Sequence, residues 1–418
     1  MTNLPENWVI ASFDEVVEVW DSLRKPINSK EREKRISYKS KRYPYYGATG
    51  QVGFIDDFLS DGEYILLGED GAPFLELTSR KAYKINGKCW VNNHAHLLKS
   101  KTNNDFLLFY LNQFDYHGYV TGTTRYKLTQ SDMRKIPIPL PPLAEQGRIV
   151  QKIEELFAEI DAGIENLKIV KNQIKLYRQS VLKNAFNQDC EKKFLKNYIA
   201  EMNYGTSEKT NDDKNGIPVL RMGDIQNGKL NFDNLKFLDT IKDGKLILKK
   251  GDLLFNRTNS SELVGKSAVF KADRKCSFAS YIIKVRFDDT LNSDYVCFYI
   301  NSPYGRQWAR SQLTQQVGQA NINGKKLQEL QIPVPSLAEQ ERIVAEIETR
   351  FERADAMELA VQNALDTAEK LKQAILKKAF RGELVPQNPN DEPASVLLER
   401  IRAQRTAEEK KTKGKSRS

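Results

Sequence analysis

The sequence predicts an α+β fold: two mixed α/β globular domains separated by two long antiparallel helices that form a coiled coil, with a pseudo-twofold internal repeat. Three observations predict it. The segment Ile138-Pro-Leu-Pro-Pro-Leu-Ala-Glu-Gln146 recurs 194 residues later as Ile332-Pro-Val-Pro-Ser-Leu-Ala-Glu-Gln340, and the match continues without a gap to Phe186 and Phe380. Apolar residues follow each copy at helical spacing. The segments before each copy contain short β-type runs broken by Gly and Asn.

Each copy of the repeat predicts a proline-bounded helix. Proline cannot continue a helix, so the Pro-rich segment fixes where the helix begins. Apolar residues then recur in steps of three, four and seven, as in Ile149, Ile153 and Phe157. A helix of about 40 residues is roughly 60 Å long at 1.5 Å per residue. Each helix has one apolar stripe, and the simplest partner is the other copy. Two separate coiled-coil dimerisation arms are the alternative.

These boundaries divide the chain into five segments. Residues 1–137 and 191–331 form the globular domains, and 138–190 and 332–385 carry the central and distal repeats with their helices. Residues 386–418 form a short amphipathic segment and a basic C-terminal tail. The expected strands are Tyr64–Leu67, Ala82–Ile85, Ile217–Leu220, Leu253–Phe255 and Tyr281–Val285, and the expected shorter helices are Asp105–Phe114, Ser293–Leu313 and Ala394–Arg405.

Composition narrows the class of protein. The net charge is +10, and 40% of the residues are hydrophobic, which excludes global disorder. No apolar run approaches the roughly 18 residues of a membrane span, and the N-terminus does not resemble a signal peptide. Cys89, Cys190, Cys276 and Cys297 have no paired spacing, so we expect the reduced thiols of a cytoplasmic protein. The basic tail favours attraction to a polyanion or simple solubility.

The sequence argues for binding rather than catalysis. Gly223 to Lys229 resembles a phosphate-binding loop, but Leu230 replaces the hydroxyl residue that would coordinate magnesium. No Asn/Asp-Pro-Pro-aromatic motif of adenine methyltransferases is present. His94 and His96 would share one face of a strand without an obvious third ligand, so we interpret them as surface or groove histidines. We therefore expect no catalytic residue, metal or cofactor on this chain.

Polar clusters at the expected loops predict contact with DNA. Arg, Asn and Gln make paired hydrogen bonds to base edges, whereas Ser, Thr and Lys commonly contact phosphate. The same residue types also build turns, so the clusters carry more weight than any member. The candidates in the first domain are Lys41, Arg42, Tyr45, Tyr46, Asn92, Asn93, His94, Arg125 and Lys127. Those in the second are Arg221, Asn256, Arg257, Asn259, Ser260, Lys275, Gln319, Asn321, Asn323 and Lys325.

Nearly the whole chain resembles the DNA-specificity subunit of type I restriction–modification systems. The resemblance is carried by Tyr43-Pro-Tyr-Tyr-Gly-Ala-Thr-Gly50, Trp90-Val-Asn-Asn-His-Ala-His96, Gly216-Ile-Pro-Val-Leu-Arg-Met-Gly-Asp-Ile225, Gly251-Asp-Leu-Leu-Phe-Asn-Arg257 and the twice-used Leu-Ala-Glu-Gln segment. It implies two target-recognition domains and a non-catalytic subunit that directs N6-adenine methylation, or ATP-dependent cleavage, at a bipartite double-stranded DNA target with a non-specific spacer. Recognition domains vary by design, so no single base contact carries over.

The resemblance also implies partners. Two methyltransferase subunits would bind this chain and carry S-adenosylmethionine, and through them two motor/nuclease subunits would use ATP and Mg. We expect each repeat start to dock one methyltransferase, although Glu145 and Glu339 also suit the first turn of a helix. The predicted contacts are Leu143, Glu145, Gln146, Arg148, Leu337, Glu339, Gln340 and Arg342. A stand-alone bipartite DNA-binding regulator and a coiled-coil scaffold are the alternative functions.

Overall fold

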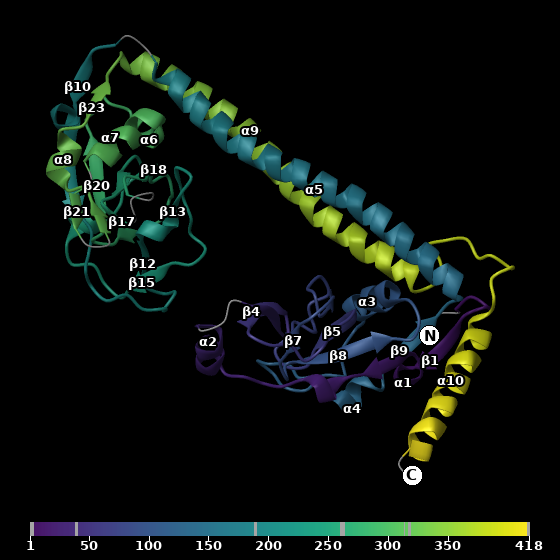
Figure 1. Cartoon of the computed structure of the whole chain (residues 1–418). Coiled ribbons are helices and arrows are strands. Elements are labelled where there is room, and N and C mark those ends of the chain that lie inside the picture. Colours follow the sequence, from purple (N-terminus) through teal and green to yellow (C-terminus); the bar gives the residue numbers. More distant parts are fainter. Residues whose placement is uncertain are drawn as a thin grey trace. The chain divides into compact units, whose positions relative to one another are not determined.

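The computed structural model describes residues 4–37, 41–187, 190–259, 264–312, 314–316 and 319–415. The chain divides into two compact units (Figure 1). Met1–Leu167 and Asn363–Ser418 form the first unit, and Lys168–Gln362 forms the second. Each unit therefore contains one globular domain and a part of both long helices.

The long helices are α5 (Leu143–Ala185) and α9 (Leu337–Ala379), each of 43 residues. In the second unit the Arg178 guanidinium lies 2.6 Å from the Asp355 carboxylate, and Lys171 donates to Gln362 at 3.3 Å. The earlier residue of α5, Lys171, thus contacts the later residue of α9, Gln362. The two helices therefore run antiparallel, which confirms the prediction. In the first unit Lys372 of α9 pairs with Asp161 of α5 at 2.5 Å.

The first domain contains three small sheets. Its strands are β1 (Val9–Ser12), β2 (Val17–Val19), β3 (Tyr43–Gly47), β4 (Gly50–Ile55), β5 (Tyr64–Gly68), β6 (Ala82–Ile85), β7 (Trp90–Val91), β8 (Ala95–Ser100) and β9 (Pro137–Leu140), and its helices are α1 (Phe13–Val16), α2 (Ser29–Ser37), α3 (Asn104–Gln113) and α4 (Gln130–Met133). The strand orders are β1-β9, β2-β8-β5-β6 and β4-β3-β7. Strands β3 and β7 run parallel, and the other neighbouring strands are antiparallel.

The second domain repeats this plan and adds to it. Its strands are β10 (Lys192–Phe194), β11 (Ile199–Tyr204), β12 (Ile217–Leu220), β13 (Ile225–Gln226), β14 (Lys229–Leu230), β15 (Lys236–Leu238), β16 (Leu253–Asn256), β17 (Thr258–Asn259), β18 (Ser267–Val269), β19 (Ser277–Phe278), β20 (Ile282–Phe287), β21 (Thr314–Gln316), β22 (Gln319–Asn321) and β23 (Gln331–Pro333). Its helices are α6 (Ser293–Asn301), α7 (Pro303–Ser311) and α8 (Gly324–Gln328).

The two domains share a topology that their sequences barely reveal. The orders β10-β23, β11-β20-β16-β18 and β15-β12-β19 match the three sheets of the first domain strand for strand. The parallel pair recurs as β12 and β19. Hairpin β13-β14 and the sheet β17-β22-β21 are additions of the second domain. The repeat therefore includes the globular domains as well as the helices.

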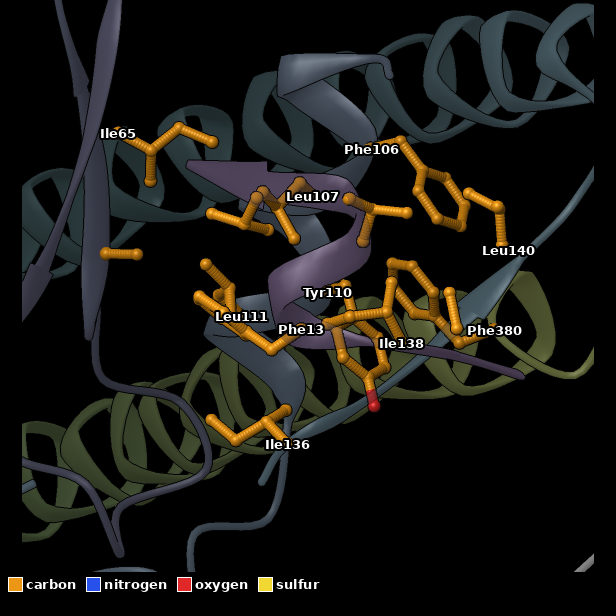
Figure 2. Close-up of a cluster of buried hydrophobic side chains, with 14 of the residues drawn as sticks. Phe13, Ile65, Phe106, Leu107, Tyr110, Leu111, Ile136, Ile138, Leu140 and Phe380 are labelled. Carbon is orange, nitrogen blue, oxygen red and sulfur yellow. The ribbon is translucent and has the colours of Figure 1, made fainter. Parts of the chain in front are cut away.

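Both long helices end in an apolar core. The core of the first unit joins Ile149 and Ile153 of α5 to Leu376 of α9 and to the buried face of α3. Figure 2 shows Phe106, Leu107, Tyr110 and Leu111 of α3 in this cluster. Phe380, just after α9, packs its ring against Phe106 and Tyr110 of α3, with centroids 5.2 Å apart in both cases. Phe186, just after α5, packs in the same way on Tyr295 and Tyr299 of α6.

Two predicted helices differ from the structure. The predicted helix Ser293–Leu313 is two helices, α6 and α7, because Ser302 caps α7 and Pro303 occupies its first turn, where proline ends the preceding helix. The second of them ends at Ser311, and Leu313 lies outside the described residues. The amphipathic segment is longer than predicted, since α10 spans Ala394–Lys415. Its apolar residues Leu397, Leu398 and Ile401 are buried in the first core. None of the helices in the described part of the chain is long and apolar enough to cross a membrane.

Candidate nucleic-acid interface

Four segments of the first domain meet at one edge of its sheets. The parallel strands β3 and β7 end together, and Asn92 donates its backbone N–H to the Tyr46 carbonyl at 3.1 Å. Glu69, just after β5, donates its N–H to the His94 carbonyl at 2.8 Å and accepts from Leu128 N–H at 2.8 Å. This edge brings together the segments that follow β3, β5 and β7 and the segment that precedes α4.

The second domain places its own loops at the same topological position. Arg257, just after β16, donates its N–H to the Tyr281 carbonyl at 3.0 Å and accepts from Ile322 N–H at 2.8 Å. The parallel strands β12 and β19 end nearby, where Ala279 donates to the Leu220 carbonyl at 2.9 Å. Arg257 is thus the counterpart of Glu69. We call these two places the strand-end surfaces.

The strand-end surface of the first domain has paired charges. Arg125 donates Nε to the Asp70 carboxylate at 2.6 Å, and His94 Nδ1 lies 3.5 Å from the same carboxylate. Lys127 Nζ lies 3.7 Å from Glu69. Three of the predicted basic or imidazole side chains therefore gather around two carboxylates, which can accept hydrogen bonds from base amino groups.

His96 belongs to the domain interior, so its interpretation as a surface or groove residue is wrong. The ring is fully buried, with Nδ1 2.7 Å from Asp21 Oδ2 and Nε2 3.1 Å from the Leu128 carbonyl. Asp21, Glu69 and His96 lie close enough together to suggest a metal site. Arg24 occupies that position, since its guanidinium pairs with Asp21 at 2.8 Å and Glu69 at 2.6 Å. We conclude that this cluster is an ion-pair network that holds Glu69 in place at the strand-end surface.

The strand-end surface of the second domain is built around Arg257, Tyr204 and the start of α8. The Arg257 guanidinium lies 4.8 Å from the Tyr204 ring centroid, and the Tyr204 hydroxyl accepts from Gly324 N–H at 2.9 Å. Asn321 is exposed and pairs with Thr258 across β22 and β17. Asn323 caps α8 through a hydrogen bond from Lys326 N–H at 3.0 Å.

Several predicted DNA contacts lie elsewhere. Tyr45 is buried, with its hydroxyl at Ile27, so its prediction as a DNA contact is corrected. Asn92 and Asn256 are also buried, and each bonds to its own chain, through His94 N–H and the Met222 carbonyl respectively. Their role is to shape the loops.

Other candidates fall at the opposite ends of the same strands. Lys41 and Arg42 are exposed before β3, whereas Tyr46 lies toward its far end. Lys275 is exposed before β19, at the end away from the strand-end surface. By contrast, Arg221 lies just after β12, at the end nearest the strand-end surface. It is partly exposed and bonds to Asp224 and to the Asn234 carbonyl.

The remaining candidates divide by what the structure describes. Asn93 and Lys325 are exposed at the two strand-end surfaces. Ser260 lies outside the described residues, and for Asn259 and Gln319 only the backbone, in β17 and β22, is described. Sequence analysis missed Glu69, Asp70, Tyr204 and Tyr281. No signal in the sequence marked them, because acidic residues repel phosphate and because a single tyrosine in or beside a strand is usually a packing residue.

At the two repeat starts, Leu143 to Arg148 and Leu337 to Arg342, several of the predicted partner contacts instead bond within the chain. Gln146 and Gln340 are fully buried and bond to their own chain, which corrects the prediction that they contact a partner. Glu145 is also buried, where Trp8 and Gln387 donate to it at 3.1 and 2.7 Å. Burial raises the pKa of Glu145, and these two donors only partly offset that rise.

The two repeat starts differ in the partner of their arginine. Arg148 pairs with Asp391, which precedes α10, at 2.6 Å, and this contact raises the pKa of the guanidinium. Its counterpart Arg342 instead pairs with Glu339 on the same exposed turn at 2.8 Å. Leu143 and Leu337 remain exposed. The predicted docking surface therefore keeps these leucines, with Glu339 and Arg342 on the second repeat.

Comparisons with known proteins identify relatives over most of the chain. A family model described as the type I restriction modification DNA specificity domain matches residues 5–169 and 187–366. The EcoKI specificity subunit of Escherichia coli (strain K12) is 31% identical over 299 residues, which cover 65% of this chain and 64% of that protein. The StySPI specificity subunit of Salmonella potsdam is 30% identical over 340 residues, covering 75% of this chain and 72% of that protein.

A solved structure supports the fold. It comes from work on complex assembly and conformational transition of the type I R-M system, with a TM-score of 0.70 and 19% identity. The alignment covers 92% of this chain and 100% of the solved chain.

Proposed function

This chain belongs to the family of type I restriction modification DNA specificity domains, and we propose that each globular domain binds one half of a split DNA sequence through its strand-end surface. Specificity subunits are the non-catalytic DNA-recognition components of restriction–modification enzymes, and they act with other subunits. Family membership favours this function over a stand-alone regulator or a coiled-coil scaffold.

One observation carries the proposal. The same strand-end position recurs in both domains on one topology, but its side chains differ: Glu69 and Asp70 in the first domain, Arg257 and Asn321 in the second. Two domains with the same topology but different polar side chains at the same edge are suited to recognise two different DNA sequences.

The resemblance to type I specificity subunits implies the partners, and the repeat supports their number. Two copies of the long helix and its start offer two similar surfaces, which supports two methyltransferase subunits per chain, with two motor/nuclease subunits joined through them. S-adenosylmethionine, ATP and Mg would then be bound by those partners. Leu143 and Leu337, with Glu339 and Arg342, are the accessible residues of these surfaces.

A methylation map tests the proposal. This chain and its methyltransferase, expressed in cells without other adenine methylation, should methylate a split sequence in genomic DNA. Exchange of residues 1–137 for the equivalent segment of a relative should change one half of that sequence only. Simultaneous change of both halves would show that the two domains do not act independently.

A further inference from the structure

Arg257 has a fixed backbone in the middle of the second strand-end surface. Its N–H donates to the Tyr281 carbonyl and its carbonyl accepts from Ile322 N–H, so hydrogen bonds hold it on both sides. Neighbouring Asn256 is buried and bonded to the Met222 carbonyl. The point from which the Arg257 side chain leaves the domain is therefore set by the fold.

The direction of the Arg257 side chain is set by Tyr204. The guanidinium lies over the Tyr204 ring at 4.8 Å, a geometry that attracts a cation to an aromatic face. The ring is itself fixed, since its hydroxyl accepts from Gly324 N–H at the start of α8. An unrestrained lysine or arginine side chain would lose conformational entropy when it binds DNA. Arg257 is already ordered, so this cost is smaller for it.

Among the described residues, no hydrogen-bond acceptor is recorded for the Arg257 guanidinium. Its Nε is buried and has no partner among the described residues, and no described carboxylate pairs with its guanidinium. Arg221, which precedes the Met222 that bonds to Asn256, instead donates to Asp224 and the Asn234 carbonyl. The counterpart Glu69 is paired with Arg24 and Lys127. The buried Nε is out of reach of a ligand, so Nη1 and Nη2 of this partly exposed side chain are the donors that DNA could use.

We propose that Arg257 recognises a guanine in the half-site bound by the second domain, donating to its O6 and N7 atoms in the major groove. The inference rests on the proposed function. Guanine presents two adjacent acceptors that match the guanidinium fork, and this is the commonest specific contact between protein and DNA. Phosphate is better matched by the exposed lysine Lys325 at the start of α8. At the counterpart position, Glu69 gives the first domain the opposite charge.

The test uses the complex of the full chain with its methyltransferase. Methylated sites are mapped by sequencing for the wild type and for Arg257→Lys, which keeps the charge but loses the fork. We expect one G·C position in the second domain's half to become degenerate, while the other half stays unchanged. Binding of the wild-type site should weaken about tenfold to a hundredfold, as loss of a bidentate base contact does.

Two further variants separate recognition from folding. Tyr204→Phe keeps the ring but removes the acceptor for Gly324 N–H, so it should weaken the same position to a smaller degree. Lys275→Ala, on the same domain but away from the surface, should leave the methylated sequence unchanged. Thermal unfolding of each complex checks that the domain is intact.

The outcomes are distinguishable. A wild-type half-site without a G·C pair would overturn the role of Arg257. So would an unchanged sequence in Arg257→Lys with uniformly weaker binding, which is the behaviour of a phosphate contact. If the wild-type complex methylates no split sequence at all, the proposed function itself fails.

Discussion

Asn103 donates its backbone N–H to the side-chain Oε1 of Gln146 at 3.1 Å, and Asn292 does the same to Gln340 at 2.9 Å. Each asparagine caps the helix that packs against a long-helix end, α3 or α6. Each glutamine also donates to the carbonyl of a proline five residues earlier. These bonds join a long helix to its globular domain and explain why the glutamine repeats without invoking a partner.

Replacing Gln146 with Leu should lower the stability of the first unit where α3 meets the start of α5. The change leaves the Asn103 N–H and the Pro141 carbonyl without partners, and an unpaired buried polar group costs about 1–3 kcal/mol. Hydrogen exchange should become faster in α3 and at the start of α5. Gln340→Leu should produce the same effect in α6 instead.

Two variants calibrate the Gln146 experiment. Gln146→Glu keeps the acceptor for Asn103 but places an ionisable carboxyl in a buried site, so its effect should be smaller only at acidic pH, where the protonated carboxyl is neutral and can donate to the Pro141 carbonyl. Gln151→Ala, exposed on the same helix, should change nothing. Equal exchange in Gln146→Leu and the wild type would show that the bond does not stabilise the junction.

The two phenylalanines after the long helices should act as a matched pair. Phe380→Ala removes a buried ring from Phe106 and Tyr110, and Phe186→Ala removes one from α6. Truncation of a buried phenylalanine typically costs about 3–5 kcal/mol. Limited proteolysis should therefore open the first unit in Phe380→Ala and the second in Phe186→Ala. Damage to both units by either change would contradict their independence.

Periodicity predicted the fold better than it predicted the candidate site. Heptad spacing and Pro-rich starts located α5 and α9, and Ala82–Ile85 and Ile217–Leu220 are strands with the predicted bounds. Spacing and proline positions are visible within a short stretch of the chain, so a single sequence is enough to predict these elements. The burial of Tyr45 and His96 depends on contacts with distant segments, which residue type alone does not reveal.

Glu145 should make the stability of the first unit depend on pH. Burial raises its pKa above the unfolded value, so its favourable contribution is complete below the unfolded pKa and is lost as pH rises through the folded pKa. At neutral pH the buried carboxylate therefore costs stability. Glu145→Gln still offers an oxygen to Trp8 and Gln387 but cannot ionise.

The measurement is urea unfolding of wild type and Glu145→Gln between pH 3.5 and pH 7, a range set around the usual glutamate pKa of about 4.3. The variant should be the more stable protein at pH 7, and the difference should shrink toward pH 3.5. Glu155→Gln, an exposed change on the same helix, is the control. A variant that is less stable at pH 7 would mean that the ionised carboxylate is favoured by Arg148 beyond the cost of burial.

The last prediction concerns the second repeat start as a docking surface for a methyltransferase. Leu337 is 40% exposed, and among the described residues Arg342 forms ion pairs along its own helix, with Glu339 and Glu346. The first repeat start differs, because Arg148 is bound to Asp391. Exposed leucine beside an accessible arginine is a combination that suits a protein interface.

Leu337→Ala with Arg342→Ala should therefore weaken one methyltransferase site and leave the other occupied. Native mass spectrometry of the purified complex measures this as a shift from two methyltransferases per chain to one. Arg350→Ala, which removes a similar exposed pair with Glu346 two turns later, is the matched control. Circular dichroism should show unchanged helix content in both variants. A complex that keeps both methyltransferases would exclude this surface as the docking site, and the repeated residues would then be explained by helix initiation and by the glutamine junction.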